Sequence, residues 1–157
     1  MAGTQPQLIK TISELHRLRD LPKPQHPLIS VINFADIKST GDNEPQSLVQ
    51  QFFAIALKRM VNGRMKYGQQ EYDYEEGLMF FMAPGQVFSI TASEDFQHTG
   101  WLILIHPDFL WNTPLAKTIR QYEYFDYSVN EALFLSEKEE TIITGIVKYS
   151  AGIPRKH

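Results

Sequence analysis

The chain has 157 residues, enough for one domain, and its 43% hydrophobic and 12% aromatic content disfavours intrinsic disorder. Fifteen Lys and Arg against 18 Asp and Glu give a net charge of −3, which disfavours a domain that binds nucleic acid through its phosphates. The sequence has no cysteine, no signal peptide and no apolar run near the roughly 20 residues of a membrane span, so we expect a cytoplasmic protein with neither disulfides nor a membrane partner.

The N-terminal part of the chain predicts a short helix and one strand. Residues 1–10 are expected to form a disordered terminus. Thr11 and Glu14 have the spacing of a capping box, which predicts that a helix begins there. Pro22 and the two prolines that follow it exclude further helix, and the apolar run 28–32 then predicts a buried strand.

The region between residues 48 and 105 predicts short antiparallel strands. Residues 48–60 fit either a helix or a strand, because their apolar positions match both periods. Asn62 and Gly63 form a strong hairpin turn signal. Further strands are expected within residues 64–75, 78–82, 87–91 and 101–105, with a turn at 83–85 and a polar loop at 93–99. This density of short strands favours a closed or sandwiched antiparallel sheet.

The C-terminal third predicts two helices. Thr113 before Pro114 predicts a helix that continues through Tyr122, and Ser136 with Glu139 forms a second capping box. The second helix carries an apolar stripe made of Ile142, Ile143, Ile146 and Val147. Since the β region has enough apolar residues for its own core, we expect part of this stripe to bind a second copy of the chain. Ile143 and Val147 are the predicted dimerisation residues.

The sequence predicts no metal site and no catalytic residue. Of the five histidines, only His98 and His106 fall in the β region, near opposite ends of a strand of about six residues, so they cannot share an ion. No nucleophile elbow, phosphate-binding loop or dinucleotide fingerprint is present. The acidic residues within 71–76 suit a solvated strand face. We therefore expect a protein that is not an enzyme and that holds no cofactor.

Aromatic side chains on the predicted strands either fill the interior of a barrel or line a ligand cavity there. Core filling is the default, and a binding role also needs polar groups that converge on the cavity. The candidate ligand-binding residues are Tyr67, Phe80, Met82, Phe88, Trp101 and His106. Strand alternation places Phe80 and Met82 on one face.

Several short motifs follow one another along the chain: Tyr67-Gly68-Gln69-Gln70, Ala83-Pro84-Gly85-Gln86, Gly100-Trp101-Leu102, His106-Pro107-Asp108-Phe109-Leu110 and Thr113-Pro114-Leu115-Ala116. As an ordered set within residues 10–148, they resemble the N-terminal regulatory domain of AraC-type transcriptional regulators, of the kind abundant in Bacteroidetes. The resemblance implies a mainly β fold with C-terminal helices. In this fold a short helix and a cupin-like double-stranded β-helix, or jelly-roll barrel, occupy 11–110. Two or three dimerising α-helices follow at 111–150, then a tail at 151–157, and residues 48–60 become strand.

The same resemblance implies a metal-free domain that binds a small-molecule effector and forms a homodimer. Phe88 stands where metal-binding cupins carry a histidine, so apolar contact would replace metal chemistry there. The family binds DNA through a C-terminal helix-turn-helix domain, which the residues after Ser136 do not resemble; we expect it to be absent from this chain and DNA contact to depend on it. Two alternatives stay open: a small cupin-type enzyme, and a structural dimer module with a filled barrel.

Overall fold

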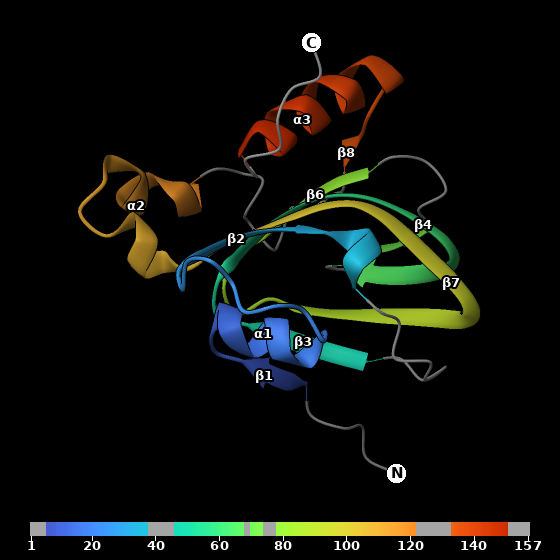
Figure 1. The fold of residues 1–157 in the computed structure, drawn as a ribbon, viewed down its shortest axis with the longest axis horizontal. Helices are drawn as coiled ribbons and strands as arrows, with labels where there is room; N and C mark the ends of the chain where they lie inside the picture. Colours follow the sequence, from blue (N-terminus) through green and yellow to red (C-terminus); the bar gives the residue numbers. More distant parts are fainter. Residues whose placement is uncertain (1–5, 38–45, 68–69, 74–77, 122–132, 151–157) are drawn as a thin grey trace.

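The structure is a computed structural model that describes residues 6–37, 46–67, 70–73, 78–121 and 133–150 (Figure 1). The described strands form one eight-stranded sheet, and helices occupy most of the described C-terminal third. The prediction of a mainly β fold with C-terminal helices is confirmed.

Two long strands form the centre of the sheet. β4 (Phe53–Tyr67) and β7 (Val87–Ile105) run antiparallel and pair along nearly their whole length. The pairing register shifts between Val61 and Gly63, which divides the β4–β7 ribbon into two arms. Figure 1 shows the ribbon curving round, with β2 and β6 beside one arm and β3 beside the other.

Shorter strands extend each arm. The first arm gains β2 (Ile29–Asn33) on β7, β6 (Leu78–Met82) on β4, and β8 (Leu133–Phe134) on β6. The second arm gains β3 (Gln46–Gln50) on β7, β5 (Gln70–Asp73) on β4, and β1 (Gln7–Ile9), which runs parallel to β3.

The main core unites side chains from both arms. They belong to one buried apolar cluster, whose members include Ile32, Leu48, Phe80 and Phe88. The helix α1 (Ile12–Leu18) adds Ile12 and Leu15 to this cluster. Ala54 and Ala56 of β4 face the cluster, whereas Phe53 of the same strand belongs to a second, smaller cluster. β4 is therefore buried on both faces.

Short helices after β7 cover the second face of β4. They are η2 (Pro107–Leu110), α2 (Pro114–Thr118) and η3 (Ile119–Gln121). Leu110 and Ile119 from these turns pack with Phe53. The predicted helix through Tyr122 is therefore shorter than expected, because α2 ends at Thr118 and the chain tightens into a 3-10 turn. No helix in the described ranges is long and apolar enough to cross a membrane.

Both predicted capping boxes lie at helix starts. Before α3 (Glu137–Ser150), the Ser136 amide donates to Glu139 Oε1 (3.1 Å) and the Glu139 amide donates to Ser136 Oγ (3.2 Å). These hydrogen bonds from Ser136 lower the pKa of the Glu139 carboxyl. At α1 the Glu14 amide donates to Thr11 Oγ1 (3.1 Å), but the Glu14 carboxylate accepts from the Lys10 amide (2.7 Å), so only half of that box forms.

Two predictions within the β region are wrong, and they share one cause. Asn62 and Gly63 lie inside β4 and not in a hairpin turn, and residues 87–105 form one strand and not two strands with a loop. Val61 pairs with Gln97 and Gly63 with Ala92, so the single residue between them on β4 faces the four residues 93–96 of β7. Turn-forming and polar residues here build a bulge, which lets the ribbon bend without ending either strand.

Other expectations from the sequence can also be compared with the structure. The N-terminus is not disordered through residue 10, because β1 pairs with β3 and Ile9 is buried. The ambiguous stretch 48–60 is strand, as the resemblance implied, divided between β3 and β4. The turn at 83–85 follows β6 as predicted. The tail 151–157 lies outside the described residues, so nothing tests that expectation.

Candidate functional site

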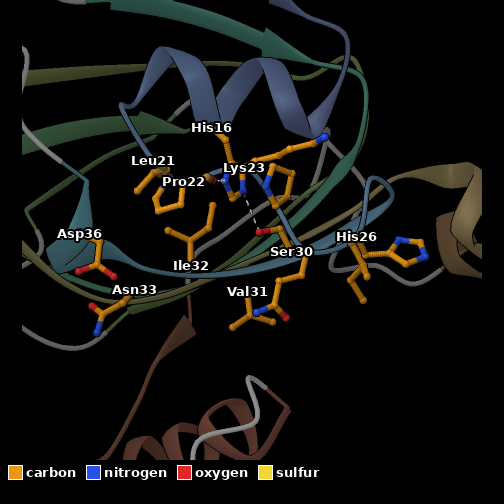
Figure 2. A pocket seen from close by; sticks show the side chains of 13 residues that line it. His16, Leu21, Pro22, Lys23, His26, Ser30, Val31, Ile32, Asn33 and Asp36 are labelled. Carbon is orange, nitrogen blue, oxygen red and sulfur yellow. Dashed lines mark hydrogen bonds between the residues drawn. The ribbon is translucent and has the colours of Figure 1, made fainter.

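An open cavity of about 370 Å³ lies between α1, the proline-rich segment 21–27 and β2 (Figure 2). Its polar lining includes His16, His26, Ser30, Asn33 and Asp36. We call this space the α1–β2 cavity. No sequence pattern predicted this cavity, because its lining combines residues from separate elements that meet only in the folded chain.

The proline-rich segment forms one wall of the α1–β2 cavity for local reasons. Asp20 adopts a left-handed conformation (φ 57°) just after α1 and turns the chain back. Leu21 then packs against the main core, and its amide donates to the His16 carbonyl oxygen (2.8 Å). The prolines that follow cannot donate backbone hydrogen bonds, so the segment runs past β2 without joining the sheet.

His16 is the best-buried polar group of the cavity, with 7% of its surface exposed. Its Nδ1 lies 2.7 Å from the Pro22 carbonyl oxygen, and its Nε2 lies 2.8 Å from Ser30 Oγ. A carbonyl oxygen only accepts hydrogen bonds, so Nδ1 carries a proton. In the neutral ring Nε2 is then an acceptor, and the Ser30 hydroxyl donates to it (dashed in Figure 2).

The remaining polar groups lie around β2: Asn33 ends the strand, Asp36 follows it, and Lys23, Gln25 and His26 come from the proline-rich segment. Figure 2 shows Asn33 and Asp36 near one end of the cavity and His26 near the other. Asn33 Oδ1 accepts from the Ala35 amide (2.9 Å), and Asp36 is exposed. The cavity thus offers amides, a carboxylate, an ammonium, a hydroxyl and imidazoles to a small polar molecule.

The wall of the cavity is joined to the C-terminal helices. The His106 amide donates to the Leu28 carbonyl oxygen (2.8 Å), directly after the proline-rich segment. The His26 ring packs edge-on against Phe109 of η2, with 5.6 Å between ring centroids. Movement of the proline-rich segment would therefore also move η2, which leads into α2.

Three of the six predicted ligand-binding residues come together, but in the core. Phe80, Met82 and Phe88 are 1%, 3% and 8% exposed and belong to the main apolar cluster. Phe80 and Met82 share a face, as alternation predicted. Met79 and Phe81, on the other face of β6, are more exposed. These three side chains pack against other residues of the protein, so they fill the interior in the part of the chain that the structure describes.

The other three candidates lie apart from this cluster or are not tested. Trp101 is half-buried on β7, where it pairs with Asn33 and Leu57. His106 caps η2, because its Nδ1 accepts from the Asp108 amide (3.1 Å). Tyr67 pairs with Phe88 at the end of β4, but its side chain lies outside what the structure describes. The structure therefore does not assemble the six residues into one site.

Lys58 is a buried charged residue that the sequence analysis missed. It lies on β4, its side chain is 3% exposed, and its Nζ sits 4.5 Å from the centroid of the Phe34 ring. Burial, with a smaller contribution from the positive charge of Arg19, lowers the pKa of Lys58 to about 7. The strand pattern did not place Lys58 on the core side, because Lys58 shares its face with two alanines and the larger apolar side chains lie on the other face.

The predicted dimerisation stripe is divided in the structure. Val147 is 5% exposed, Ile143 is half-buried, and α3 packs against β7. Val147 therefore belongs to packing within the chain, which corrects its assignment to a dimer surface. Ile142 and Ile146 are 55% and 61% exposed and form the accessible part of the stripe.

Within the described ranges, no group of three or more His, Cys, Asp or Glu side chains could hold a metal ion. A scan against protein-family models finds no match to this chain. A search of curated proteins likewise finds no similar sequence.

Proposed function

We propose that this chain is the ligand-sensing and dimerisation domain of an AraC-type transcriptional regulator, with a cupin-like barrel. Its DNA contacts would come from a separate helix-turn-helix domain. The ordered motifs of the sequence and the mainly β fold with C-terminal helices support this proposal. A structural dimer module is the second candidate, and the packed positions of Phe80, Met82 and Phe88 favour it.

One observation carries the sensing function. The same segment that forms a wall of the α1–β2 cavity contacts η2 through His26 and Phe109, and Leu28, the residue that follows the segment, accepts a hydrogen bond from His106, which caps η2. A bound effector that holds this segment in one position would favour one arrangement of the C-terminal helices. The effector acts only through its different affinities for the two arrangements. We place it in the α1–β2 cavity and not in the barrel interior.

The sensing proposal predicts a small polar effector whose binding depends on Asp36. In a thermal-shift screen of sugars, amino acids and small carboxylic acids, at least one compound is expected to raise the melting temperature of the chain. Asp36→Ala removes a carboxylate from the cavity and should weaken the binding of this compound by about tenfold, the effect expected from the loss of one good hydrogen bond. Glu137→Ala, which removes an exposed carboxylate on α3, is the matched control.

The coupling to the C-terminal helices is tested separately. Phe109→Ala removes the contact with His26 from the side that does not line the cavity, so it should leave effector affinity within about threefold while abolishing any effect of the effector on self-association. A screen without a binder, or binders that Asp36→Ala leaves unaffected, would favour the structural dimer module.

The dimer is expected to use the exposed part of α3. Ile142 and Ile146 lie one turn apart on the same face, and burying each is worth about 1.5 to 3 kcal/mol. The double variant Ile142→Lys/Ile146→Lys should weaken dimerisation at least about 100-fold in sedimentation equilibrium. Thr141→Lys/Gly145→Lys adds the same charges with the same spacing at exposed positions and should weaken it much less. Equal effects of the two variants would contradict this assignment.

A further inference from the structure

The α1–β2 cavity contains a serine and a histidine in hydrogen-bond contact. Ser30 Oγ lies 2.8 Å from His16 Nε2, within the reach of a nucleophile and its general base. The other ring nitrogen, Nδ1, is held 2.7 Å from the Pro22 carbonyl oxygen. A fixed acceptor at Nδ1 orients the ring and keeps the lone pair of Nε2 directed at the serine.

Three threonine hydroxyls in the described part of the chain have a different environment. Thr113, Thr118 and Thr141 donate to backbone carbonyl oxygens three or four residues earlier, and such oxygens cannot take a proton. Ser30 donates to a ring nitrogen that can take one. Ser30 is also half-buried at the border of the cavity, whereas a hydroxyl used only for packing needs no open space beside it.

We propose that Ser30 is a nucleophile, activated by His16, that accepts an acyl group from a small ester bound in the α1–β2 cavity. This activity goes beyond effector sensing, although it uses the same cavity. It does not require the chain to be a regulator.

The reaction balances with the groups present and water. Ser30 Oγ attacks the ester carbonyl carbon, and its proton passes to His16 Nε2. The carbon–oxygen bond to the leaving alcohol breaks, and that alcohol takes the proton from Nε2. The acyl group is then bound to Ser30 as an ester. Water, deprotonated by the same nitrogen, releases it as a carboxylic acid and restores the free hydroxyl.

The test uses a fluorophosphonate probe, which reacts with an activated serine by losing fluoride and forming a phosphorus–oxygen bond. We expect mass spectrometry of the labelled 157-residue chain to locate the adduct on Ser30. Ser30→Ala should lose the adduct, and His16→Gln should slow its formation at least about 100-fold, as the loss of a general base does. Ser47→Ala, which removes a half-buried serine on β3, should label like the unmodified chain.

A second measurement covers the case in which His16→Gln does not fold. In the Ser30→Cys variant, the His16 ring should favour the thiolate form of the new cysteine. Iodoacetamide should therefore alkylate this cysteine at least about tenfold faster than the cysteine of the Ser47→Cys variant. No adduct, an adduct on another residue, or equal alkylation rates would overturn the proposal. Each of these results leaves effector sensing intact, because Asp36→Ala tests that function without Ser30.

Discussion

Gly100→Ala is expected to lower the free energy of unfolding by at least about 3 kcal/mol, or to prevent folding. Gly100 has φ 115°, a backbone conformation that residues with a side chain rarely adopt. A Cβ atom at this position would lie 1.9 Å from the Leu57 carbonyl oxygen and 3.1 Å from the Lys58 Cα. Both are backbone atoms of the paired strand β4, so the clash can be relieved only by separating the two strands.

Variants at two other glycines distinguish the cost of a positive φ from the cost of the clash with β4. Gly85→Ala has the same kind of positive φ (88°) but no atom within 4 Å of the new Cβ, so it should cost only about 1 kcal/mol. Gly145 is an exposed residue in the middle of α3, and a Cβ atom there would have no atom within 4 Å. Gly145→Ala should therefore stabilise the protein by up to about 1 kcal/mol. Urea denaturation measures all three. A Gly100→Ala variant no less stable than Gly85→Ala would show that β4 and β7 do not approach closely there.

Lys58→Met is expected to stabilise the protein, and the gain should depend on pH. In the unfolded chain the lysine titrates near its ordinary pKa of 10.5, whereas in the folded protein burial lowers that pKa to about 7. Between these values the unfolded state binds more protons than the folded state, so the stability of the unmodified protein rises with pH. Below pH 7 the folded state must bury the charged ammonium, and the penalty is complete.

The expected gain from Lys58→Met at pH 6 is about 3 to 5 kcal/mol, because one pKa unit corresponds to 1.36 kcal/mol. The gain should shrink steadily above pH 7, to about 1 kcal/mol at pH 10, because the amine is by then neutral in the folded protein and the unfolded chain is close to its own pKa of 10.5. Lys10→Met, at an exposed lysine, is the matched control and should leave the pH dependence unchanged. Denaturation curves at pH 6, 8 and 10 measure the effect. Parallel pH profiles for the unmodified chain and Lys58→Met would contradict the burial of a titrating lysine.

The bulge in the β4–β7 ribbon shows where local signals mislead. Asn62 and Gly63 are chemically suited to a tight turn, and residues 93–99 are polar enough for a loop. Both features lie opposite each other at the register shift, where β4 and β7 continue. Whether turn residues close a hairpin or form a bulge depends on the partner strand, which is far away in the sequence.

Lys58 was missed for a related reason. Its strand presents the larger side chains of Phe53, Ile55 and Leu57 on one face and two alanines with the lysine on the other, so the larger side chains look like the inner face. The short helices after β7 cover that face, and the bent sheet encloses the other. A sequence pattern cannot show that a strand is covered twice, since each cover comes from a distant segment.

The sequence by itself determined the elements that depend on neighbouring residues. The box of Ser136 and Glu139 begins α3, and the alternation of residues 78–82 sorts β6 into an inner and an outer face, because both patterns act within a few residues. Only the tertiary structure decided the candidate site. His16 and Ser30 are 14 residues apart, and they meet because β2 pairs with β7 while the proline-rich segment turns back under α1. Backbone pairing and chain reversal over that distance, more than any motif, create the α1–β2 cavity.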